Sequence, residues 1–191
     1  MIVRIFWGMV LLTRLNVLPV SGAEVERHAT ADGTVAISIA GEIVEGDAEA
    51  LRLEIQTAQS ANFSISEIQL NSIGGSLYEG TSLARVVRAK SLNTRVAEHS
   101  ICASACFLVF AAGLTKTVQN GARVGVHAAT LESGADTHIS IKATESMGRI
   151  AALLDVPSEI IGRMVSTPAS QIFWLNEAAL ASMGANITDG K

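Results

Sequence analysis

ICASACFLVFAA, residues 101–112, carries one hydroxyl side chain, that of Ser104, among small and apolar residues. From residue 103 to residue 112 the segment is apolar on every side, which is typical of a helix buried in the centre of a domain. The residues just before it read as the end of a strand. We therefore expect a strand that leads directly into a central helix, with Ser104 at the junction.

Strands and helices alternate on both sides of this junction. Residues 35–39, for example, alternate apolar and polar side chains with the period of a half-buried strand, and residues 47–60 carry an apolar face with helical spacing. This order predicts an α/β fold in which successive strands pair in parallel. The predicted strands are 35–39, 67–70, 94–97, 118 and 123–127, and the predicted helices are 47–60 (capped by Asp47), 78–90, 103–112, 137–154, 157–165 and one that Asn176 caps and that ends at Gly184.

Composition excludes several classes of protein. The 191 residues are 49% apolar and 17% charged, so the chain can build a core and is not intrinsically disordered. Its net charge of −4 and its 4% aromatic content argue against a nucleic-acid partner, which needs basic patches or stacking platforms. Two cysteines and four scattered histidines give no ligand spacing, so we expect no metal and no cofactor.

The first 23 residues are typical of a secretory signal peptide. Arg4 supplies a positive start, residues 5–12 form a short apolar stretch, and Ser21-Gly22-Ala23 offers small residues for cleavage. The apolar stretch is shorter than the roughly 20 residues that span a bilayer. We expect a single domain over residues 24–191 that is periplasmic or secreted. The alternatives are membrane association through residues 1–23 if they stay uncleaved, and an ordinary buried first helix.

Three segments could carry chemistry, and the first is NSIGGS, residues 71–76. Its two glycines follow a predicted strand and precede a predicted helix. Glycines at such a turn let backbone N–H groups approach a ligand and stabilise a developing negative charge. The alternative is a tight strand-to-helix turn without any further role.

The second segment is the junction at Ser104. A serine flanked by small residues between a strand and a helix can present its hydroxyl, while the next N–H lies at the helix N-terminus. That is the arrangement of a nucleophile elbow with half of an oxyanion hole. The alternative is that Ser104 only caps the helix.

The third segment is Val124-Gly125-Val126-His127, a histidine at the end of an apolar strand. Such a histidine can act as a general base, although a purely structural role is the alternative. The other histidines are weaker candidates. We expect His28 in a mobile terminus, His138 at the start of a helix, and His99 either solvated or lining the site.

Together, the Gly-Gly-Ser turn, the small-residue helix start at Ser104 and the strand-end His127 resemble the Clp protease proteolytic subunit, a member of the crotonase-like superfamily. Residues 102–106, Cys-Ala-Ser-Ala-Cys, resemble its secreted bacterial relatives. The likeness covers about residues 35–187 and includes 39–43 and 176–184. It implies a fold of repeated β-β-α units with a mostly parallel sheet flanked by helices.

The resemblance also implies roles for individual residues. Ser104 would be the nucleophile of an acyl transfer, His127 its general base, and the N–H groups of Gly75 and Ala105 the oxyanion hole. A peptide or protein substrate would lie extended along a strand edge beside the glycine turn. The resemblance further implies a homo-oligomer.

One member of the family's catalytic triad is missing. The third residue, an aspartate in the family, should fall within residues 167–172, which contain no carboxylate. Ser170 or Gln171 could orient the imidazole instead, or a carboxylate from elsewhere could replace it, the candidates being Glu132, Asp136 and Asp155. The chain is thus predicted to be an exported serine peptidase with an incomplete or unusual triad. The alternatives are a catalytically impaired protein that binds peptides or partner proteins in the same groove, and an acyl-thioester enzyme, against which export counts.

Cys102 and Cys106 flank Ser104 and leave two alternatives open. In an oxidising compartment an even pair of cysteines suggests a disulfide. Two buried thiols that pack as small apolar residues are the other interpretation. Cys106 is a poor alternative nucleophile, because a thiol inside an apolar helix is inert.

Overall fold

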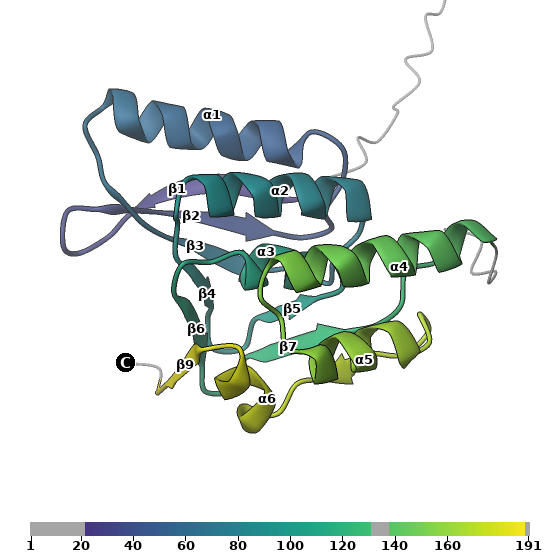
Figure 1. Ribbon diagram of the computed structural model, residues 1–191. Coiled ribbons are helices and arrows are strands. Elements are labelled where there is room, and N and C mark those ends of the chain that lie inside the picture. Colours follow the sequence, from purple (N-terminus) through teal and green to yellow (C-terminus); the bar gives the residue numbers. More distant parts are fainter. Residues whose placement is uncertain (1–21, 131–137, 190–191) are drawn as a thin grey trace, which may run out of the picture.

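The computed structural model describes residues 22–130 and 138–189 (Figure 1). The predicted signal peptide therefore lies almost wholly outside the described residues, as do Glu132 and Asp136. The strands are β1 (Glu24–Ala29), β2 (Val35–Ala40), β3 (Ile65–Asn71), β4 (Thr94–Val96), β5 (Ile101–Ala103), β6 (Lys116–Gln119), β7 (Arg123–Val126), β8 (Phe173–Trp174) and β9 (Ala185–Thr188). The helices are α1 (Asp47–Ser60), α2 (Leu77–Ala89), α3 (Ala105–Ala111), α4 (His138–Leu153), α5 (Ser158–Ser166) and α6 (Glu177–Ser182).

The strands form two sheets rather than the one that the sequence predicted. The larger has the order β1-β2-β3-β4-β6-β9 and the smaller the order β5-β7-β8. Neighbouring strands are parallel except for β1 with β2 and β7 with β8. The β-β-α order recurs, but after β4 and after β6 the chain crosses from the larger sheet to the smaller one. The fold is thus mixed α/β, and the pairs β4-β5 and β6-β7 divide their strands between the two sheets.

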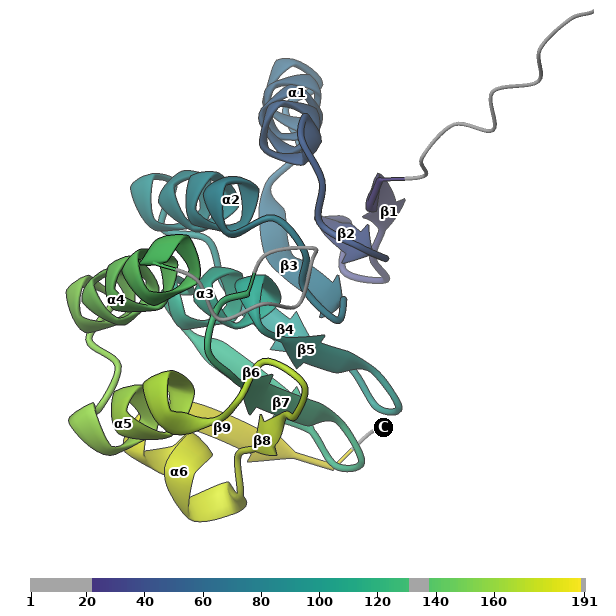
Figure 2. The same ribbon diagram turned by 90° about the vertical axis from the view of Figure 1, so that its right-hand side faces the viewer.

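Helix α3 occupies the centre of the core. Each of its residues is at most 1% exposed, which confirms the predicted buried helix. Gly80 of α2 lets the two helices approach closely, because a Cβ there would lie 2.8 Å from the Ala105 Cβ. Figure 2 shows the helices gathered on one side of the larger sheet. No helix within the described ranges is both long and apolar enough to cross a membrane.

The sequence analysis did not predict strand β1. It reads EVERHA, is almost wholly exposed and pairs antiparallel with β2 at the edge of the larger sheet. His28 lies in this strand with its Nε2 2.8 Å from Ser38 Oγ, so the expectation that His28 belongs to a mobile terminus was wrong. An edge strand that is largely exposed carries charges instead of an apolar pattern, which hides it from sequence analysis.

The start of α1 also differs from its prediction. Gly46, with φ 104°, is the N-cap, whereas Asp47 lies buried inside the first turn and accepts a 2.8 Å hydrogen bond from the Val44 N–H. Glu79 of α2 reaches across and accepts hydrogen bonds from the N–H groups of Ala48 and Gly46 at 2.8 and 3.2 Å. Burial raises the pKa of Asp47, and the nearby Glu79 charge acts in the same direction. The two carboxylates hold the turn that precedes α1 against α2.

Unfolding experiments can test the buried state of Asp47. Because folding raises the pKa of its carboxyl, the folded state favours the protonated form, and the stability that it contributes decreases as the pH rises above the group's ordinary pKa. As the pH rises from about 4 to 7, the free energy of unfolding is therefore expected to decrease less in an Asp47→Asn variant than in the parent. Chemical denaturation at several pH values measures this, with Glu49→Gln in the same turn as the exposed control. An equal loss in parent and variant would contradict the assignment.

Candidate active site

The glycine turn brings the end of β3 against the junction at Ser104. Gly74 and Gly75 have φ values of 102° and 139°, a region that favours glycine, and Ser76 then caps α2 by accepting a hydrogen bond from the Glu79 N–H. A Cβ on Gly74 would lie 2.6 Å from Ser104 Cβ and 2.9 Å from Ala105 N. Only a glycine therefore allows this contact between the turn and the junction.

Backbone hydrogen bonds to Ile43 fix the orientation of the Gly75 N–H. Ile43 donates its N–H to Gly74 O and accepts from Ser76 N, both at 2.8 Å. Because C=O and N–H point in opposite directions across a trans peptide, the Gly75 N–H points away from Ile43. It has no hydrogen-bond partner among the described residues. The turn thus presents one unpaired donor.

Ser104 adopts a backbone conformation that is rare for residues other than glycine. Its φ of 55° and ψ of −123° cost about 1–3 kcal/mol and persist only where the surrounding structure imposes them. Its side chain makes no capping hydrogen bond to α3, so the interpretation of Ser104 as a simple helix cap was wrong. Such a sharp strand-to-helix turn exposes the hydroxyl, and the adjacent Ala105 N–H begins the helix without an intrahelical partner.

His127 follows β7 and is oriented by a backbone group. Its Nδ1 lies 2.7 Å from the carbonyl oxygen of Ala128. A carbonyl oxygen can only accept, so Nδ1 carries the proton and the lone pair of the neutral ring lies on Nε2. This is the tautomer that a general base needs, since Nε2 is then free to accept the proton of a serine hydroxyl.

A cavity of about 710 Å³ brings the four residues together. Ser104, Ala105, Gly75 and His127 all line it, although the sequence places them on three separate segments. Apolar side chains form another part of its wall, namely Ile43, Val44, Ile73, Leu77 and Met147. In the parts of the chain that the structure describes, no hydrogen bond joins Ser104 to His127. Catalytic hydrogen bonds often tighten only when substrate is bound, so the shared cavity is the informative observation.

None of the described candidates for the third triad position contacts His127. Ser170 and Gln171 are exposed, and the structure records no hydrogen bond from either side chain to the imidazole. Asp155 is 79% exposed and pairs with Arg88 at 2.9 Å. Within residues 22–130 and 138–189, the acceptor at Nδ1 is thus a neutral carbonyl. It fixes the tautomer as a carboxylate would, but it stabilises an imidazolium less.

Cys102 and Cys106 are joined by a disulfide, with a Cα–Cα distance of 5.2 Å. Both residues are completely buried, and the structure holds neither as a free thiol. Of the two alternatives that the sequence left open, the structure has the disulfide. A disulfide-bonded Cys106 cannot be the nucleophile.

The remaining histidines lie away from this cavity. His99 has an 85% exposed side chain 3.4 Å from Glu98 and does not line the cavity, so of its two alternatives the solvated one is confirmed. His138 begins α4 as predicted. The described residues contain no group of three or more His, Cys, Asp or Glu side chains arranged to hold a metal ion.

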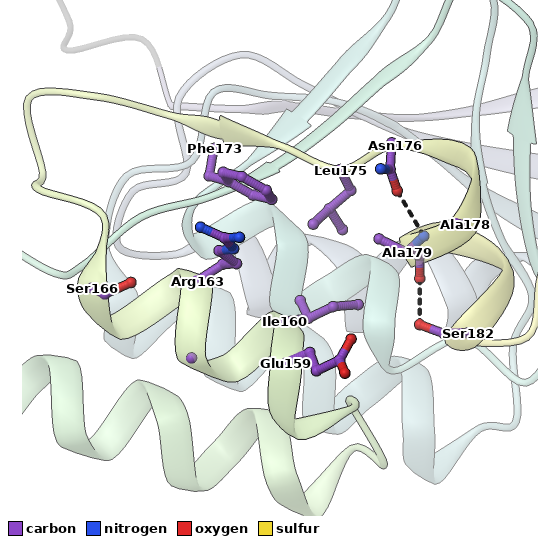
Figure 3. Close-up of a pocket in the computed structure, with 11 residues that line it drawn as sticks. Glu159, Ile160, Arg163, Ser166, Phe173, Leu175, Asn176, Ala178, Ala179 and Ser182 are labelled. Carbon is purple, nitrogen blue, oxygen red and sulfur yellow. Dashed lines mark hydrogen bonds between the residues drawn. The ribbon is translucent and has the colours of Figure 1, made fainter.

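A second cavity, of about 570 Å³, lies between α5, β8 and α6 (Figure 3). It contains the hydroxyls of Ser166 and Ser182 but no histidine, and Ser182 donates its hydroxyl proton to Ala179 O at 2.7 Å. Arg163 stacks over the Phe173 ring, 4.8 Å from its centroid. With no histidine in its lining, this cavity lacks the serine–histidine pair that the other cavity holds. The Ser104 cavity is therefore the candidate active site.

Adding a side chain at Gly74 tests the contact between the turn and Ser104. In a Gly74→Ala variant the new Cβ would overlap Ser104 Cβ and Ala103 O, and its backbone would remain strained. We expect a loss of about 3 kcal/mol in the free energy of unfolding. Denaturant titration measures it, with Gly162→Ala as the control, because a Cβ there meets no atom. Equal stability of the two variants would show that the turn does not contact Ser104.

The fold is that of the ClpP-type proteases. ClpP1 from Listeria monocytogenes is 20% identical, with a TM-score of 0.61, over 82% of this chain and 92% of that one. The ClpP catalytic domain from Plasmodium falciparum is 16% identical, with a TM-score of 0.60, over 81% and 85% of the two chains. The membrane-bound stomatin-specific protease 1510-N is 14% identical, with a TM-score of 0.61, over 80% and 77%. No protein-family model and no curated protein matches the chain at the level of sequence.

These likenesses confirm the predicted ClpP-like fold, and at such low identity they show the fold alone. Sequence analysis missed the Ala128 carbonyl and the contact of Ile43 with Gly74 and Ser76. Every residue has a carbonyl oxygen, so no residue type in the sequence could have indicated that the Ala128 carbonyl contacts His127. The second depends on a pairing between distant segments, which the Ile39–Ile43 stretch indicated only through its resemblance to the family.

Proposed function

We propose that this protein is an exported serine hydrolase, a peptidase in which Ser104 is the nucleophile and His127 the general base. The observation that carries the proposal is the cavity at which four groups meet. They are the Ser104 hydroxyl, which makes no capping bond, the His127 ring with its proton on Nδ1, and two N–H groups that have no partner among the described residues. The ClpP-like fold supports the peptidase class. Fold alone does not determine an activity, so the geometry of the site is the stronger support.

The proposed reaction is acyl transfer in two steps. Ser104 Oγ attacks the substrate carbonyl while His127 Nε2 takes its proton, and the N–H groups of Gly75 and Ala105 stabilise the oxyanion. The imidazolium then returns the proton to the leaving amine, which departs and leaves an acyl-enzyme. Water, deprotonated by His127, releases the acid and restores Ser104.

Two features of the site support a peptide substrate. The apolar part of the wall, with Ile43, Leu77 and Met147, can receive an apolar side chain. The exposed backbone at Gly75 can bond to the main chain of an extended peptide. A homo-oligomer is proposed from the resemblance alone.

Export is proposed from residues 1–23, and the Cys102–Cys106 disulfide supports an oxidising compartment. Cell fractionation and N-terminal sequencing of the expressed protein test it. We expect a periplasmic or secreted form that begins near Glu24. An intact cytoplasmic protein would contradict export and would favour the acyl-thioester alternative.

A fluorophosphonate probe tests the proposed activity without knowledge of the substrate. We expect covalent labelling of the purified protein and its loss in Ser104→Ala and His127→Ala variants. Circular dichroism and unfolding curves establish that all three proteins are folded. Absence of labelling in the folded parent would contradict the proposal and would favour a catalytically impaired protein that binds peptides in this cavity.

A further inference from the structure

The disulfide encloses the proposed nucleophile. Cys102 lies in β5 and Cys106 in the first turn of α3, so the loop that the disulfide closes contains Ala103 and, after it, Ser104 and Ala105. In the proposed mechanism Ser104 supplies the attacking oxygen, and the Ala105 N–H is one of the two oxyanion donors. The disulfide therefore links the strand side of the elbow to its helix side.

Hydrogen bonds hold mainly the strand side of this elbow. Ala103 N donates to Ser72 O at 3.0 Å, and Ser104 N donates to Gly125 O at 3.2 Å. On the helix side the Ala105 N–H has no partner among the described residues, and the first bond across the junction is from Phe107 N to Ser104 O at 3.0 Å. A strained conformation such as that of Ser104 persists only where the surrounding structure imposes it. The disulfide is the covalent link that spans it.

We propose that the Cys102–Cys106 disulfide is a positioning device that holds the Ser104 hydroxyl and the Ala105 N–H in their reactive arrangement. The inference rests on the proposed function. Reactive groups tolerate a displacement of only about 0.5 Å, so freeing the start of α3 from the end of β5 lowers the reaction rate. The proposed substrate-binding walls, at Ile43, Leu77 and Met147, lie on other segments, so we expect them to keep their positions. Since both cysteines are completely buried, the disulfide is a fixed brace rather than an exposed redox switch.

The test compares the parent with a Cys102→Ala/Cys106→Ala variant. Rates of fluorophosphonate labelling at several probe concentrations separate the maximal rate of reaction from the concentration that gives half of it. We expect the maximal rate to fall at least tenfold, whereas the half-saturating concentration changes less than twofold. A Cys102→Ala/Cys106→Val variant restores part of the buried volume that the double alanine variant lacks, but not the disulfide bond. It is expected to react as slowly as the double alanine variant. Ile55→Ala, a buried change in α1, controls for general destabilisation and should keep the parent's maximal rate.

Hydrogen exchange gives a readout that does not depend on activity. Amides 103–107 are expected to exchange at least tenfold faster in both double variants than in the parent or in Ile55→Ala. If the probe does not label the parent but amides 103–107 still exchange faster in the double variants, the proposed function is refuted. The role of the disulfide in positioning the Ser104 segment is then still supported. Parent-like labelling and exchange in the double variants would overturn the positioning role, as would recovery of the parent's rate by the valine variant.

Discussion

A Ser104→Ala variant is expected to hydrolyse a peptide or ester substrate at least about ten-thousand-fold more slowly than the parent. The reason is that the only route to an acyl-enzyme in the proposed mechanism starts from the Ser104 oxygen. Ser104 already makes no capping bond, and alanine removes only its hydroxyl, so the variant should keep the parent's fold. Substrate affinity should change little, because the cavity walls are intact.

Steady-state kinetics on a chromogenic ester, followed by a peptide library, measure this loss. Ser166→Ala is the matched control, because Ser166 lies in the cavity that lacks a histidine. It should retain the parent's rate. Substantial turnover by Ser104→Ala, or a comparable loss in Ser166→Ala, would refute the assignment of the nucleophile.

Replacement of His127 by alanine is expected to lower the same rate by about a thousand-fold to ten-thousand-fold. Without the imidazole, the proposed general base for the serine proton is lost. Because Ser104 and His127 act as one unit in the proposed mechanism, the double variant should be no slower than Ser104→Ala alone.

A double-mutant cycle in kcat/KM measures this coupling. His138→Ala at the exposed start of α4 is the control and should leave the rate unchanged. Losses that multiply in the double variant would mean that the two residues act independently. An unchanged rate in His127→Ala would exclude it as the base.

Those parts of the fold that have a strong local pattern could be predicted from the sequence. Helix α3 is apolar throughout and lies in the core, and Asn176 caps α6 by accepting a hydrogen bond from the Ala179 N–H as expected. Strand β1 could not be predicted, because its exposed, charged residues lack the alternation of a half-buried strand. The placement of β5 and β7 in a second sheet could not be predicted either. The apolar and polar pattern of a single strand does not show which strands it pairs with.

The candidate site divides in the same way. Side chains with their own chemistry, Ser104 and His127, stand out from apolar surroundings, and the glycine turn signals an unusual backbone. The structure places all three at one cavity. The orientation of His127 depends on the Ala128 carbonyl, and that of the Gly75 N–H depends on Ile43. Both are backbone contacts that form only on folding.

The Ala128 carbonyl also bears on the missing carboxylate. In a serine triad the loss of the carboxylate is costly chiefly because the histidine then adopts the wrong tautomer. Here the carbonyl already imposes the correct tautomer, so the site avoids that part of the cost. The weaker stabilisation of the imidazolium remains. We therefore expect the proposed peptidase to be slow. A peptide boronate, which mimics the tetrahedral intermediate, is a suitable ligand for it.

The most direct test is a crystal structure of the protein with a peptide boronate bound. The account predicts a covalent bond from boron to Ser104 Oγ. It also predicts one boronate oxygen about 2.7–3.1 Å from the N–H groups of Gly75 and Ala105, with His127 Nε2 within hydrogen-bonding distance of the adduct. A boronate attached to another residue, or an adduct on Ser104 whose oxygen faces away from both N–H groups, would contradict it.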